Sequence, residues 1–95
     1  MKYILMLTLM ASITQYAATG NRNAAGLWPQ VGDVACPRSI KLGTKVEIGG
    51  KTYTCRDRTA RWVEKKFPNT FDIYSEGTRT EMLKWGRRNM KIKIK

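Results

Sequence analysis

Two aspartates are the residues of this chain best suited to acid–base chemistry. Asp72 is the only charged residue in the run Thr70–Tyr74, whose other members all favour β-strands. Asp57 lies fifteen residues earlier, between two arginines. A carboxylate on an apolar strand is costly unless a partner or a reaction accounts for it. Burial also raises the pKa of such a group toward neutrality, where it can donate a proton.

Each aspartate also has a purely structural explanation. Strand alternation places Phe71 and Ile73 on one face and Asp72 with Tyr74 on the other, where Asp72 could be an ion-paired or capping acid. Asp57 could be a turn residue whose carboxylate accepts from nearby amides. The chain has 18 Lys and Arg against 7 Asp and Glu, and a nearby cation keeps a carboxylate ionised. An arginine paired with Asp72 would therefore indicate a structural role.

The N-terminus has the layout of a secretory signal peptide. Lys2 precedes an apolar run that ends at Ile13, and the small residues Ala18 and Gly20 follow. We predict a signal peptide over residues 1–20, whose cleavage would leave 75 residues without a stable membrane span. An uncleaved N-terminal anchor is the alternative, although the apolar run is shorter than the roughly 20 residues of a spanning helix. The predicted location is secreted, periplasmic or cell-envelope.

The two cysteines, Cys36 and Cys55, are predicted to form a disulfide. Export and an even cysteine count favour the bond, and a small domain benefits from a covalent tie. Two buried thiols are the alternative. The chain has no histidine and no closely spaced pair of cysteines, so we predict neither a metal site nor a cofactor.

The formal net charge of +11 indicates a polyanionic partner. For a cytoplasmic protein that partner would be nucleic acid. For an exported protein it would be an anionic cell-wall polymer or lipid head groups, so no nucleic-acid partner is predicted here. A well-solvated surface without a partner is the simpler interpretation of the same charge.

Local patterns in the first half predict a lead and three strands. Residues 21–30 are rich in Asn, Ala and Gly and are predicted to be a flexible lead. Val31–Cys36 is expected to be a short extended segment. Lys45–Ile48 and Lys51–Cys55 are predicted to form a hairpin about Gly49-Gly50, because both glycines can adopt the positive φ of a primed turn.

The second half is predicted to carry one clear helix and further strands. A helical turn or two is expected over Ala60–Lys66, in the basic connection after the hairpin. Thr78 and Glu81 have capping-box spacing, which predicts a helix over Arg79–Trp85. Met90–Lys95 alternates apolar residues with lysines, as a half-buried strand does. Five or six short strands in so small a chain predict an all-β closed barrel with one short helix before the last strand.

Four segments together resemble the 3D domain, a family named for three aspartates. They are Val34–Val46, Arg56–Thr59, Phe71–Tyr74 and Met82–Arg88. The resemblance covers residues 31–95 and implies a six-stranded double-psi β-barrel. Such domains occur in membrane-bound lytic transglycosylase A and in secreted proteins that act on peptidoglycan.

The resemblance implies that Asp72 is the catalytic acid and that Asp57 supports it. A lytic transglycosylase needs a single carboxyl group, which first protonates the glycosidic oxygen and then accepts a proton from the 6-hydroxyl of the sugar. The chain departs from the family pattern at Cys36, which replaces the first aspartate, and over Thr59–Lys66, which is longer and basic. It also has no room for the second domain that forms the substrate groove of the larger enzyme.

We therefore expect a lytic transglycosylase-like enzyme, active as a monomer, that cleaves glycosidic bonds of peptidoglycan. Tyr74, Arg56, Arg58 and Trp62 are the candidate substrate-binding residues, although core packing is the simpler interpretation of each aromatic ring. The alternative is a non-catalytic barrel that binds an anionic cell-wall glycan through the basic residues of segment 56–66. The enzyme requires Asp72 to lie in an open groove beside Asp57.

Overall fold

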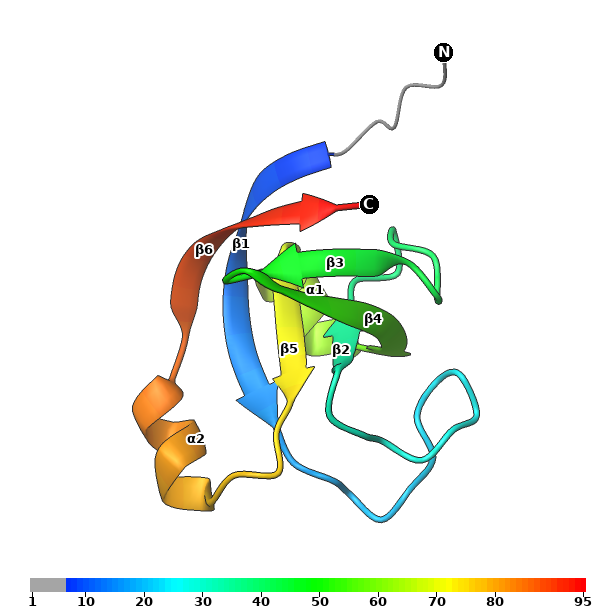
Figure 1. Cartoon of the computed structure of the whole chain (residues 1–95), viewed down its shortest axis with the longest axis vertical. Coiled ribbons are helices and arrows are strands. Elements are labelled where there is room, and N and C mark those ends of the chain that lie inside the picture. Colours follow the sequence, from blue (N-terminus) through cyan, green and yellow to red (C-terminus); the bar gives the residue numbers. More distant parts are fainter. Residues whose placement is uncertain (1–6) are drawn as a thin grey trace.

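Six strands close into a barrel in the computed structural model, which describes residues 7–95 (Figure 1). The strands are β1 (Leu7–Tyr16), β2 (Asp33–Cys36), β3 (Lys45–Ile48), β4 (Lys51–Arg58), β5 (Thr70–Tyr74) and β6 (Arg88–Ile94). Helix α1 (Arg61–Lys66) joins β4 to β5, and helix α2 (Arg79–Trp85) joins β5 to β6. The order around the barrel is β1-β5-β2-β4-β3-β6. The predicted fold class, a small all-β barrel of six strands with a short helix before the last, is confirmed.

Two of the strand pairs are parallel, and both involve strands that carry the candidate acids. β5 runs parallel to β1, and β4 runs parallel to β2. The other four pairs are antiparallel. The chain therefore crosses over the barrel, so that Asp57 on β4 and Asp72 on β5 lie on either side of β2.

The barrel interior is filled by apolar side chains from all six strands. The largest fully buried apolar residues are Ile13, Val34, Val46, Phe71 and Ile92. Phe71 and Ile73 are both buried on the core side of β5, as the alternation predicted. A disulfide joins Cys36 to Cys55 across β2 and β4, which confirms the predicted pairing.

The locally coded elements also agree with the sequence. Gly49 and Gly50 have φ angles of 60° and 81° and turn the β3–β4 hairpin. The capping box of α2 is present, since Thr78 accepts from the Glu81 amide and Glu81 accepts from the Thr78 amide. None of the helices in residues 7–95 is long and apolar enough to span a membrane.

The N-terminal segment differs from the prediction. Leu7–Tyr16, assigned above to a signal peptide, forms β1 and pairs with both β5 and β6 (Figure 1). Ala11 and Ile13 of this strand are buried in the core. The barrel therefore begins at Leu7 and not at residue 31, and cleavage after Gly20 would remove one of its six strands. Lys2, the charged residue of the predicted signal, lies outside the described residues.

The predicted flexible lead is tied to the barrel by hydrogen bonds. Asn23 is buried, and its side-chain oxygen accepts from the amides of Ala25 and Leu27. The Ala25 amide also donates to the carbonyl of Arg56 on β4. Residues 21–30 are thus held against β4 by hydrogen bonds.

Candidate functional site

A row of outward-facing residues crosses four adjacent strands. Thr14 on β1 is the register partner of Asp72 on β5. Asp72 is paired with Ala35 on β2, which in turn is paired with Asp57 on β4. The core contains the residues on either side of Asp72 and of Ala35 and the residue before Thr14, so these three side chains lie on the opposite, outer face. The register between β2 and β4 shifts between Val34 and Ala35, and this irregularity brings Asp57 opposite Ala35. The small Ala35 side chain separates the two carboxylates.

Asp72 is half-buried and accepts a hydrogen bond from the Thr14 hydroxyl at 2.9 Å. Burial raises the pKa of Asp72 to about 6, and the charge of Asp57 adds to the rise. The Thr14 hydrogen bond and the charge of Arg87 lower the pKa but do not cancel these effects. Roughly a tenth of the molecules would carry the proton at pH 7, and half near pH 6.

No ion pair of residues 7–95 involves Asp72. Arg56 instead pairs with Asp33 at 2.9 Å. Arg58 donates to the carbonyl oxygens of Pro37, at 2.8 Å, and Ile40. Neither arginine therefore binds the acid, and both hold structural parts of the barrel.

Asp57 has the amide contacts expected of a structural aspartate. Its Oδ1 accepts from the backbone amides of Ala24, at 3.1 Å, and Arg58, at 2.8 Å. The first of these bonds fastens the lead to β4. Asp57 nevertheless remains close enough to Asp72 for its charge to raise the pKa of that acid.

A third aspartate, Asp33, belongs to the same region and was not predicted. It is fully buried and accepts from the Gln30 amide at 3.0 Å, the Arg56 guanidinium at 2.9 Å and the Asn23 side chain at 3.5 Å. Its position directly before an apolar strand was the only sequence signal. The contacts identify it as an anchor for the lead.

Tyr16 was also missed, because it lies in the segment assigned to a signal peptide. Its hydroxyl is buried and has no hydrogen-bond partner within the described part of the chain. Burial raises the pKa of Tyr16, and the charges of Asp57, Asp33 and Asp72 raise it further. Three carboxylates therefore lie near enough to this phenol for their charges to act on it. The polar alternation of β1 at Thr14 and Tyr16 was the available signal.

The two aromatic candidates lie in different surroundings. Tyr74 is buried beside Tyr16, with ring centroids 5.6 Å apart in an edge-on arrangement. Trp62 on α1 is 69% exposed. Trp62 is thus accessible to a ligand, whereas Tyr74 is buried and packs against Tyr16.

Arg87 forms a polar cluster on β1 and β5, two residues before Thr14 and Asp72 along these strands. It donates to the hydroxyls of Ser12, at 2.6 Å, and Thr70, at 3.0 Å, and stacks 4.3 Å from the Phe67 ring. Ser12 and Thr70 are register partners, two residues before Thr14 and Asp72. Arg87 follows α2 in the sequence, and only the closed barrel brings it near Asp72.

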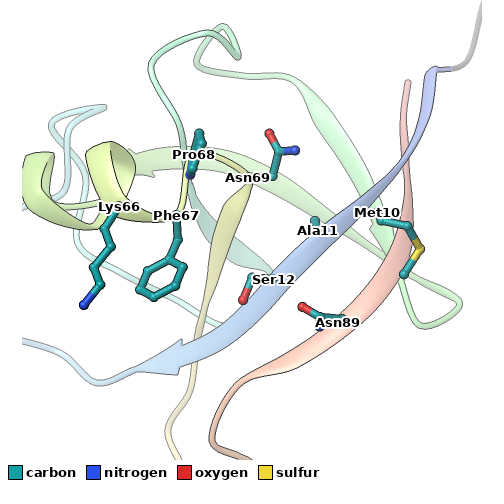
Figure 2. A pocket seen from close by; sticks show the side chains of 8 residues that line it. All are labelled: Met10, Ala11, Ser12, Lys66, Phe67, Pro68, Asn69 and Asn89. Carbon is teal, nitrogen blue, oxygen red and sulfur yellow. The ribbon is translucent and has the colours of Figure 1, made fainter.

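A pocket of about 380 Å³ opens at this cluster, between the end of α1 and strands β1 and β6 (Figure 2). Its floor is largely apolar, and amide and lysine side chains stand at its margin. The lining residues are Met10, Ala11, Ser12, Lys66, Phe67, Pro68, Asn69 and Asn89.

Residues 7–95 contain no group of three or more His, Cys, Asp or Glu side chains arranged to hold a metal ion. No protein-family model matches the chain, and no curated protein matches it.

Proposed function

We propose that this protein cleaves glycosidic bonds of peptidoglycan as a lytic transglycosylase, with Asp72 as general acid and then general base. The proposal depends chiefly on the environment of Asp72. This carboxyl group is half-buried and takes part in no ion pair within residues 7–95, and burial, with a contribution from the Asp57 charge, raises its pKa to about 6. A general acid needs such a pKa to hold a proton near neutral pH.

The reaction uses one carboxyl group in two steps. Protonated Asp72 gives its proton to the glycosidic oxygen, the bond from C1 to that oxygen breaks, and the positive charge develops at C1. The Asp72 carboxylate then takes the proton of the 6-hydroxyl on the same sugar. The 6-oxygen bonds to C1 and closes a 1,6-anhydro ring. The acid is regenerated, and no water is consumed.

The neighbours of Asp72 have separate positioning roles in this scheme. The Thr14 hydroxyl fixes the orientation of the carboxyl group. The Asp57 charge favours the protonated state at the start and would also stabilise positive charge developing at C1.

The disulfide favours an oxidising location, such as the cell envelope or the exterior. Because Leu7–Tyr16 supplies β1, the exported form that we propose retains this segment. We therefore propose secretion together with the peptidoglycan substrate.

The test is to incubate the oxidised full-length chain with purified peptidoglycan and to analyse the soluble products by mass spectrometry. We expect anhydro-muropeptides from the native protein and none from Asp72→Asn. Glu76→Gln, which makes the same carboxylate-to-amide change at an exposed turn, is the matched control and should retain activity. Products with ordinary reducing ends would show that the protein hydrolyses the bond and is not a transglycosylase.

A non-catalytic glycan-binding barrel is the second candidate, and the unpaired charge of α1 favours it. Arg61, Lys65 and Lys66 are all exposed on this helix. If no products form and the protein sediments with peptidoglycan, both before and after Asp72→Asn, binding is the function and Asp72 is structural.

A further inference from the structure

The pocket is lined by the Phe67 ring and by Lys66, and Arg87 stacks on the same ring without lining the pocket. The Arg87 guanidinium is 4.3 Å and the Lys66 ammonium 5.6 Å from the centroid of this ring. Phe67 is 37% exposed, so part of the ring is open to a ligand. Figure 2 shows Phe67 and Lys66 extending from the end of α1, with Asn89 facing Ser12 from β6.

Neither cation is neutralised by the protein. Lys66 and Arg87 take part in no ion pair with a carboxylate of the described chain. The two hydrogen bonds of Arg87 go to uncharged hydroxyls. An aromatic side chain beside a lysine without an ion pair suits a ligand with an apolar face and a negative charge.

The pocket lies near the proposed acid, and Asp72 itself is not among the lining residues. Ser12, which lines it, is two residues from Thr14 on the same face of β1, a distance of about 7 Å along a strand. Arg87 is close enough for its charge to lower the pKa of Asp72. One sugar unit spans a similar distance, so a glycan with its scissile oxygen at Asp72 would place the adjoining unit in this pocket.

We propose that this pocket binds the carboxylate-bearing N-acetyl sugar of the glycan strand, an inference that rests on the proposed function. The sugar ring packs against Phe67, and the Asn69 and Asn89 amides lie within the same lining to meet its polar groups. The carboxylate of its side arm pairs with Lys66, the cation that lines the pocket. The pocket would therefore fix which of the two alternating sugars lies on each side of Asp72.

The test measures binding without cleavage, in the Asp72→Asn background, by isothermal titration calorimetry. The two probes are a tetrasaccharide of alternating N-acetylglucosamine and N-acetylmuramic acid, and the carboxylate-free tetramer of N-acetylglucosamine. We expect the acidic probe to bind roughly five-fold more tightly, as one partly exposed ion pair supplies. Lys66→Gln should abolish that difference, and Phe67→Ala should weaken both probes about ten-fold.

Lys65→Gln is the matched control, because Lys65 is the neighbouring exposed lysine and does not line the pocket. It should leave both affinities unchanged. Equal binding of the two probes, an equal effect of Lys65→Gln and Lys66→Gln, or no binding of either probe would overturn the assignment. If the native protein nevertheless releases anhydro-muropeptides, the proposed reaction would stand and only the pocket assignment would be wrong. If the protein binds the acidic probe preferentially but the native protein releases no products, the pocket assignment would be supported and the proposed reaction would be wrong.

Discussion

At the scale of single residues, Asp72 combines a raised pKa with a cost in stability. Its pKa is about 6 in the folded protein against an ordinary value of 3.8. The folded state therefore binds this proton more tightly than the unfolded state does. Protonation stabilises the fold fully below about pH 4, and this contribution is lost as the pH rises through 6. At neutral pH the ionised carboxylate destabilises the barrel.

Asp72→Asn is therefore expected to increase the free energy of unfolding at pH 7 by about 1 to 3 kcal/mol. The same variant should flatten the dependence of stability on pH between 4 and 6. Urea unfolding of both proteins across this range measures the effect. Equal pH dependence in the two proteins would mean that the Asp72 carboxyl group is well solvated, which would also remove the main support for its role as an acid.

Thr14→Val is expected to shift the pH at which activity falls off on the alkaline side to a higher value, by roughly half to one pH unit. The lost hydrogen bond stabilises the ionised form of Asp72, so its removal raises the pKa further and extends the protonated range. Initial rates of product release between pH 5 and 8 provide the measurement. Thr14→Ser keeps the hydroxyl and should keep the native profile, whereas identical shifts in both variants would argue against this hydrogen bond.

At the scale of elements, β1 decides whether the barrel closes. It lies between β5 and β6 and contributes buried residues to the core. A chain starting at Asn21 would leave both neighbouring strands with unpaired edges, and exposed edges promote aggregation. We expect this shortened chain to lose cooperative thermal unfolding and the dispersed NMR spectrum of a packed core.

Substitutions within β1 give a milder test in the full-length chain. Ile13 is fully buried, so Ile13→Ala should cost about 2 to 5 kcal/mol of stability. Met10 is 57% exposed, and Met10→Ala should change stability by about 0.5 kcal/mol or less. A cooperatively folded chain lacking residues 1–20, together with a silent Ile13→Ala, would mean that β1 is dispensable.

Elements with local chemical signals were predictable, and β1 was not. The β3–β4 hairpin depends on Gly49-Gly50, and α2 depends on a capping box within its own first turn. An apolar run followed by small residues is equally typical of a buried strand and of a signal peptide. The choice between them depends on partners at β5 and β6, which lie far along the chain.

The same distinction separates the predicted from the unpredicted site residues. Asp72 and Asp57 were identifiable because acids are scarce and each lies in an unusual run. Arg87, Asp33 and Tyr16 reach the site only through barrel closure, so no local pattern indicated them. The pairing of Arg56 with Asp33 rather than Asp72 likewise depended on tertiary structure.

At the scale of the whole molecule, the acid site and the pocket occupy one outer wall. The row from Thr14 to Asp57 crosses β1, β5, β2 and β4, and the Arg87 cluster adjoins it along β1 and β5. The disulfide lies on the core side of β2 and β4. The buried interior thus maintains the shape of the barrel, and the proposed acid and the proposed binding pocket both lie on its exterior.

The pairing of β1 with β6 has a consequence for biosynthesis. These strands come from opposite ends of the chain, with Leu7 opposite Ile94. β6 is synthesised after the other five strands, so the barrel cannot close before synthesis has passed Ile94. Contacts between distant segments also slow folding. A barrel that stays open until β6 has been made is compatible with passage through a secretion channel, so in the export that we propose the barrel would close after the chain has crossed.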